Sequence, residues 1–106
     1  MTSSKLRAEK ETLLVYIPCY TDYKLALTQA LKIREIQAIE TVLPMDIQIM
    51  VSCNGAELSD AEKREFEKVC DFSNILSFGI SGDINITQGF MHGIRLGVDY
   101  LWILSS

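Results

Sequence analysis

The chain has 106 residues, of which 48% are hydrophobic and 23% charged, and its formal net charge is −4. These values are typical of a single globular domain and exclude disordered, collagen-like and coiled-coil chains. Apolar runs reach about five residues, far short of the roughly 20 that cross a bilayer, and the polar N-terminus lacks the apolar stretch of a secretory signal. An acidic chain without a basic stripe is not expected to have nucleic acid as a partner. We expect a cytoplasmic protein, with a membrane-peripheral location as an alternative.

The first half of the chain predicts a polar leader at 1–11, then a strand, a helix and a second strand. "TLLVYIP" (12–18) is a β-branched and aromatic run that suits a buried strand. Apolar residues then recur at three- and four-residue steps, which predicts an amphipathic helix over 22–43. A proline ends this helix, and "MDIQIMVSCNG" (45–55) alternates before an Asn-Gly turn, as a second strand does.

The next segment predicts a second helix and a third strand. "ELSDAEKREFEKVCDF" (57–72) has Ser59 and, three residues later, Glu62, which is the spacing of a capping box at the start of a helix. "NILSFGI" (74–80) is short and apolar, as expected of a strand. The glycine-bearing polar stretch "SGDIN" (81–85) predicts a loop.

The end of the chain predicts a third helix over 86–100 and a fourth, buried strand over 100–104. Four-residue spacing places three glycines on one face of this helix, where another backbone can approach closely. The residues expected to point inward are Phe90 and Ile94, with Val98 as a further candidate, and the glycines are Gly89, Gly93 and Gly97.

Alternation of strands and helices predicts an α/β fold, a Rossmann-like three-layer sandwich with a mainly parallel four-stranded sheet and three crossover helices. Such sheets bind ligands beyond the carboxyl ends of their strands. The segments of interest are therefore "PCYTD", "SCNGAE" and "SGDIN". Neither GxxxxGK[ST] nor GxGxxG follows the first strand, so a phosphate-cradling glycine loop is not predicted.

Three strand-end segments together resemble one family. "VYIPCYTDYKLALTQAL", "IQIMVSCNGAELSD" and "GDINITQGFMHGIRLGVDYLWILSS" are similar, in this order, to the N-terminal half of family 2 GT-A glycosyltransferases. The resemblance implies that residues 12–106 form a partial GT-A domain, the part of such an enzyme that binds a nucleotide sugar. The implied reaction moves a sugar from a nucleotide diphosphate, most simply a UDP-type donor, to a hydroxyl of a glycan, a lipid-linked acceptor or a protein.

The strand ends carry residue types that suit a nucleotide. Pro18 fixes the turn that aims Tyr20, whose ring can stack on a base, although a packing tyrosine is the alternative. The resemblance implies that Asn54 accepts the uracil imide proton, while Asn54 and Gly55 alone also read as an ordinary turn. Asp83 and Asn85 align with a family segment beside the ribose and diphosphate. The predicted nucleotide-binding residues are Pro18, Tyr20, Asn54, Gly55, Asp83 and Asn85.

Departures from the family pattern affect the metal and the base. The family continues its last strand into an Asp-x-Asp motif that holds Mg²⁺ or Mn²⁺, whereas Ser105 and Ser106 stand here. Cys53 stands where members often have Asp, and Ala56 replaces a common Ser. The expectation is a fragment, expressed short or naturally clipped, with no catalytic residue, no tightly held metal and little transferase activity alone. Mg or Mn is then expected only in the full-length enzyme.

Other readings of the same residues remain open. One alternative is a non-catalytic nucleotide-binding or protein-interaction module of the same fold. Another is redox or metal sensing through Cys19 and Cys53, which end neighbouring strands. His92 has no second ligand nearby in sequence and is expected to be structural or on the surface. The open edge and apolar side chains of the last strand predict a homo-oligomer.

Overall fold

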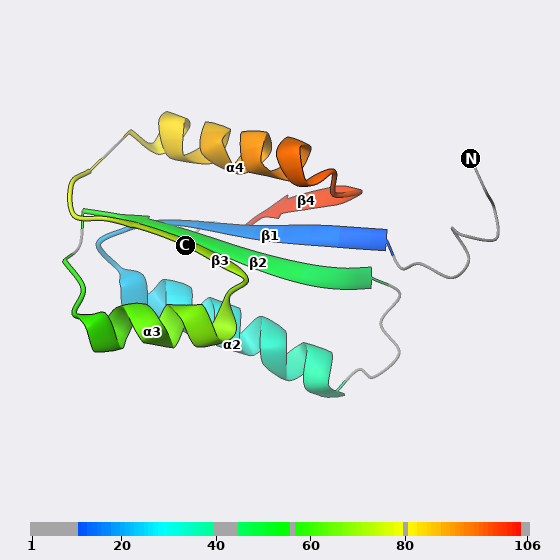
Figure 1. Ribbon diagram of the computed structural model, residues 1–106, viewed down its shortest axis with the longest axis horizontal. Helices are drawn as coiled ribbons and strands as arrows, with labels where there is room; N and C mark the ends of the chain where they lie inside the picture. Colours follow the sequence, from blue (N-terminus) through cyan, green and yellow to red (C-terminus); the bar gives the residue numbers. More distant parts are fainter. Residues whose placement is uncertain (1–10, 40–44, 56, 80, 105–106) are drawn as a thin grey trace.

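Strands and helices alternate along the whole of the chain that the computed structural model describes, which is residues 11–39, 45–55, 57–79 and 81–104. Figure 1 shows them as a sheet between two helical layers, with α4 over one face and α2 and α3 over the other. The elements are β1 (Glu11–Tyr20), α2 (Tyr23–Ile39), β2 (Met45–Asn54), α3 (Asp60–Val69), β3 (Phe72–Leu76), α4 (Gly82–Leu96) and β4 (Tyr100–Ile103).

The sheet formed by the described strands is four-stranded and parallel throughout, in the order β3-β2-β1-β4. β1 pairs with β2 over their full length, from Glu11 opposite Met45 to Tyr20 opposite Asn54. On its other side β1 pairs with β4, where Tyr16 lies opposite Ile103. The chain thus builds outward from β1 through β2 to β3, and then crosses back to the far side of β1. This is the Rossmann-like α/β topology that the sequence predicted.

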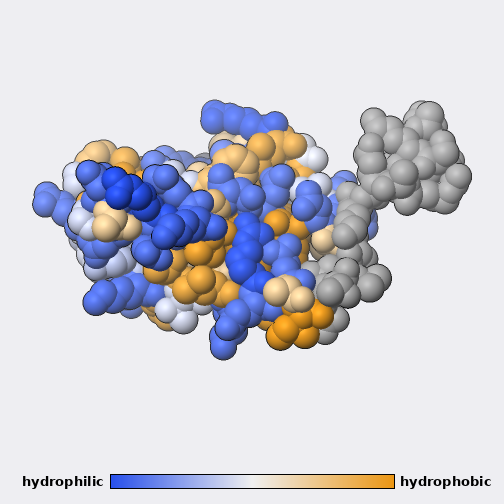
Figure 2. All heavy atoms as spheres, turned by 60° about the horizontal axis from the view of Figure 1, so that its bottom comes forward, coloured by the Kyte–Doolittle hydropathy of each residue, from blue (hydrophilic) through white to orange (hydrophobic). Residues whose placement is uncertain are grey.

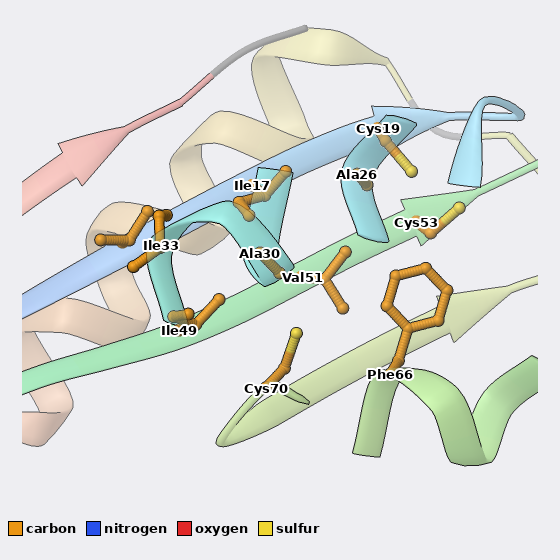
Figure 3. Packing of buried hydrophobic residues seen from close by; sticks show 11 residues of the cluster. Ile17, Cys19, Ala26, Ala30, Ile33, Ile49, Val51, Cys53, Phe66 and Cys70 are labelled. Carbon is orange, nitrogen blue, oxygen red and sulfur yellow. The ribbon is translucent and has the colours of Figure 1, made fainter. Parts of the chain in front are cut away.

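Strand alternation divides the core between the two faces, because successive side chains point to opposite sides of a sheet. Figure 3 shows the larger cluster, which lies between the sheet and helices α2 and α3. Ile17 and Val51 from the strands pack there with Ala30 of α2 and Phe66 of α3. The smaller cluster lies on the α4 side and contains Leu14, Tyr16 and Met50.

Helix α2 differs in part from the predicted amphipathic helix. It covers Tyr23–Ile39, and the predicted extension to 40–43 lies outside the described residues. Its buried positions are Ala26, Ala30 and Ile33, so small side chains allow the helix to lie close to the sheet. The large apolar residues of α2 that remain exposed are Leu25, Leu31, Ile36 and Ile39. The side of the molecule that carries α2 and α3 therefore shows both hydrophilic and hydrophobic patches (Figure 2).

Helix α3 confirms the predicted capping box. The Ser59 hydroxyl accepts a hydrogen bond from the Glu62 backbone N–H (3.2 Å), and the Glu62 carboxylate accepts one from the Ser59 N–H (2.8 Å). The helix ends at Val69, and β3 begins at Phe72, two residues before the strand predicted at 74–80. Because α3 ends before residue 72, where the predicted helix segment ended, the chain can begin β3 earlier than predicted.

Helix α4 corrects two expectations. The stretch 81–85 is not a loop, because Ser81 is the N-cap and α4 begins at Gly82. Phe90 and Ile94 were expected to point inward, yet they are 51% and 74% exposed. Gly89 faces the sheet instead: a Cβ there would lie 2.5 Å from the buried Tyr16 ring. The Tyr16 ring of β1 fills the space at this contact, so the helix has room only for a glycine there.

Three further predictions for this end of the chain have mixed outcomes. Gly93 shares the inward face, since a Cβ there would make ordinary contact with Leu14. Gly97 does not, because it is the left-handed C-cap of α4, with φ 68°. Val98 packs against the cluster of Leu14 and Tyr16, as proposed for it.

Strand β4 is an edge strand rather than a fully buried one. Leu101 and Ile103 turn toward the α4 side and pack on the cluster there. Tyr100 and Trp102 point to the other face and are each about half exposed. Among the described residues, no helix is long and apolar enough to span a membrane.

Candidate functional site

An open pocket of about 780 Å³ lies at the carboxyl ends of β1 and β2. Its walls come from the last residues of these strands, the start of α2, the segment after β3 and the first turn of α4. The strand order reverses beside β1, which lies between β2 and β4. Open α/β sheets bind their ligands at such a switch point, so this pocket is the candidate site.

Four of the six residues predicted from sequence line this pocket. Pro18 and Tyr20 come from β1, Asn54 from β2 and Asn85 from α4. Segments separated by some 30 residues of chain therefore meet at one rim. Gly55 lies against the Tyr20 ring at the edge of the pocket.

Asp83 lies in the first turn of α4, next to the pocket-lining Gly82. Its side chain is outside what the structure describes, and so are Ala56, Ser105 and Ser106. The predicted contribution of the Asp83 carboxylate to the site therefore stays a prediction.

The Tyr20 side chain forms an aromatic shelf over two glycines. A Cβ on Gly55 would lie 2.5 Å from Tyr20 Cε1, and a Cβ on Gly79 would lie 2.8 Å from the same atom. Gly55 also has φ +82°, a conformation that favours glycine. Tyr20 as a whole residue is nevertheless 64% exposed. One part of it is thus supported by backbone while the rest is open to a ligand.

The backbone is strained directly after this shelf. Thr21 has φ 65°, which is unusual for a β-branched residue. Its N–H donates to the Asn54 carbonyl (3.0 Å), so the turn is tied to the end of β2. The Asp22 carboxylate then accepts from the Leu25 N–H (3.3 Å) near the start of α2. Strain of this kind is found at functional sites, where surrounding contacts hold it in place.

Beneath the pocket a buried polar network joins α4 to the sheet. The Tyr16 hydroxyl lies 2.6 Å from Asn85 Oδ1 and 2.8 Å from the Asn85 carbonyl oxygen. The Asn85 amide donates to the Ser52 carbonyl (3.4 Å). Burial raises the pKa of Tyr16, although a hydrogen bond with Ser52 opposes this effect, so the tyrosine is a neutral donor. The amide of Asn85 is thus engaged within the protein, and Asn85 shapes the pocket wall.

The described lining of the pocket carries negative charge. It includes the carboxylate of Asp22 and no lysine or arginine. Within the described ranges, no three His, Cys, Asp or Glu side chains gather in a group that could hold a metal ion. The N-terminus of α4 contributes Gly82 to the lining, and a helix N-terminus presents N–H groups to negative charge.

A second hollow of about 500 Å³ lies between α4 and the strands β2 and β3. His92 lines it and contacts Phe72 edge-on, with 4.8 Å between ring centroids. The Nε2 atom of His92 is buried and has no hydrogen-bond partner in the described part of the chain. This packing fits the structural role predicted for His92.

Sequence reasoning missed several pocket residues. Cys19 and Asp22 belong to the segment "PCYTD" that the sequence places at the binding edge, but neither is predicted to bind the nucleotide. Leu25 is predicted only as a helix residue and Gly79 only as a strand residue. No local signal in the sequence identifies Gly79, because its contact with Tyr20 joins two segments that are far apart in the chain.

Comparison with known proteins found no match at any of three levels: no family model, no curated protein and no solved structure matches this chain.

Proposed function

We propose that the pocket at the ends of β1 and β2 binds the nucleotide part of a nucleoside diphosphate sugar, with uracil as the base. The observation that carries the proposal is the convergence of Pro18, Tyr20 and Asn54 on one pocket at the switch point of the sheet. The resemblance of the strand ends to family 2 GT-A glycosyltransferases supports the same ligand class. The GT-A assignment itself is part of this proposal.

Tyr20 and Asn54 have different roles in the proposed complex. The exposed Tyr20 ring stacks on the base, which any nucleobase tolerates because all have a π-face. Asn54 is 2% exposed and borders the pocket, so its amide is held in place by the protein. A side-chain amide oxygen accepts from an N–H and therefore discriminates between base edges.

The diphosphate needs positive charge that the described lining does not provide. The α4 N-terminus contributes partial charge through its N–H groups. Mg²⁺ or Mn²⁺ would offset the remainder in a glycosyltransferase, but the described residues do not form a site for it. We therefore assign no step of sugar transfer to these residues. Transfer of the sugar to a glycan, lipid or protein hydroxyl is part of the proposal.

Calorimetric titration with UDP, GDP and dTDP, each with and without Mn²⁺, tests the proposal. We expect UDP to bind most tightly, and Tyr20→Ala to weaken its binding by about 5- to 150-fold, since a stacked base contributes about 1–3 kcal/mol. Phe90→Ala is the matched control, because Phe90 is also an exposed aromatic residue but lies in α4 outside the lining of the pocket. Equal binding of all three nucleotides, or no effect of Tyr20→Ala, would contradict the proposal.

We also propose that two copies of the chain associate through the edge of β4. The support is the exposure of Tyr100 and Trp102 on this edge strand. An open edge with large apolar side chains favours pairing with another strand. Association would extend the sheet beyond β4 and cover the exposed side chains of Tyr100 and Trp102.

A further inference from the structure

Two buried cysteines lie beside each other at the ends of β1 and β2. Cys19 and Cys53 are direct partners in the parallel register and belong to the same core cluster. Figure 3 shows their side chains on the same face of the sheet, with the two sulfur atoms extending into a common space. Both residues are buried, but Cys19 also contributes to the lining of the pocket.

This arrangement is compatible with a covalent bond between the two sulfurs. Neighbouring strands lie about 4.7–4.9 Å apart, and disulfides join Cα atoms about 4.4–6.8 Å apart. Each cysteine is the last residue but one of its strand, so the backbone can adjust at the strand ends. The pocket gives a small molecule a path to Cys19.

We propose that Cys19 and Cys53 are a redox-active pair that forms a reversible intramolecular disulfide on reaction with a hydroperoxide. The Cys19 thiolate, at the lining of the pocket, attacks the terminal oxygen of the hydroperoxide, the O–O bond breaks, and the alcohol or water leaves with the proton that the Cys19 thiol had released. Cys19 is then a sulfenic acid. Cys53 attacks this sulfur, an S–S bond forms, and the S–O bond breaks to release water that carries the Cys53 proton. The two thiols lose two electrons, which reduce the peroxide.

Access makes Cys19 the first nucleophile, because Cys19 lines the pocket whereas Cys53 is fully buried. A hydrogen bond between the two thiols couples their ionisation, since it lowers the pKa of one sulfur of the pair. Cys70 differs, because burial raises its pKa to about 12 and thus disfavours its thiolate.

The disulfide would act on the rim of the pocket. Tyr20 follows Cys19 directly, and Asn54 follows Cys53. The hydrogen bond from the Thr21 N–H to the Asn54 carbonyl already joins these strand ends. A bond between the sulfurs adds a covalent link one residue earlier, and so connects oxidation to the position of the aromatic shelf.

The test is peptide mapping of the full chain after treatment with hydrogen peroxide. We expect two of the three thiols to be lost, at monomeric mass, with tryptic peptides 11–24 and 35–63 linked and dithiothreitol restoring both thiols. Cys70→Ala should behave like the wild type. Cys53→Ala should give no linked peptide and leave a sulfenic acid on Cys19 that dimedone traps.

Three results would overturn the proposal: retention of all thiols, a linked peptide that contains Cys70, or oxidation of each cysteine to sulfinic acid without any link. Mapping of the wild type decides among them, so the test does not depend on the folding of a variant. It also uses no nucleotide, and its outcome is therefore independent of the proposed function.

Discussion

Alanine at Gly89 and at Gly93 should have opposite effects on stability, although both glycines lie in α4 and face the sheet. A Cβ on Gly89 would lie 2.5 Å from Cδ2 and 2.7 Å from Cγ of Tyr16, a buried ring. A Cβ on Gly93 would lie 3.5 Å or more from its nearest neighbours, which is ordinary contact. Gly89→Ala therefore forces the helix or the ring to move, and Gly93→Ala does not.

The magnitude follows from two opposing effects. Replacing glycine by alanine inside a helix stabilises the helix by about 1 kcal/mol at either position. Overpacking a core costs about 1–3 kcal/mol, and here it applies to Gly89 alone. Gly93→Ala should thus be about 1 kcal/mol more stable than the wild type. Since the helix gain cancels between the two variants, Gly89→Ala should be about 1–3 kcal/mol less stable than Gly93→Ala.

Urea unfolding, followed by the fluorescence of the single tryptophan, measures this difference. With a slope of about 1 kcal/mol per molar, the midpoints of the two variants should differ by about 1–3 M. In a Tyr16→Leu background the cost of Gly89→Ala should shrink, because the ring that it meets is gone. The reasoning is refuted if Gly89→Ala is at least as stable as Gly93→Ala.

Two further predictions concern α3 and β4. The Tyr23 hydroxyl donates a hydrogen bond to the Glu62 carboxylate, which lowers the pKa of Glu62. The resulting stabilisation is present above the unfolded-state pKa of about 4.3 and is lost as the pH falls through the lower folded-state pKa. Glu62→Gln should therefore flatten the dependence of the free energy of urea unfolding on pH below about pH 4.5. An equal slope of this free energy against pH in the wild type and in the variant would contradict the prediction. Trp102→Lys should abolish the proposed self-association through β4, as measured by sedimentation. Ile39→Lys, at another exposed apolar residue, should leave it unchanged. A wild-type protein that stays monomeric at high concentration would count against the β4 interface.

The alternation of elements and the capping of α3 could be predicted from sequence because their signals are local. The Ser59 and Glu62 spacing specifies hydrogen bonds within one helical turn, and the structure contains both. The strand positions follow from short apolar runs. With the strands in parallel, the rule that ligands bind at carboxyl ends also predicts that Tyr20 and Asn54 meet at one rim, and both residues line the pocket.

The orientation of α4 could not be predicted in this way. Hydrophobic periodicity assumes that the large apolar residues face inward, which assigned Phe90 and Ile94 to the core. The inward face carries Gly89 instead, because the Tyr16 ring of the opposing strand already fills the space. Similarly, the composition of 81–85 is that of a turn, yet Ser81 caps a helix through its bond from the Ile84 N–H. The first error arises because the deciding contact lies on another element, whereas the second concerns a local cap that lacks the Glu or Gln of a capping box three residues after Ser81.

Tyr16 connects the packing of α4 to the shape of the candidate site. Its ring lies against Gly89, and its hydroxyl bonds to Asn85, one helical turn earlier. Two contacts four residues apart on the same helix fix both the height of α4 over the sheet and its position along β1. Gly82 and Asn85, which line the pocket, are placed by this same arrangement. A change that moves Tyr16 must therefore move one wall of the pocket, although Tyr16 itself lies on the buried side of that wall.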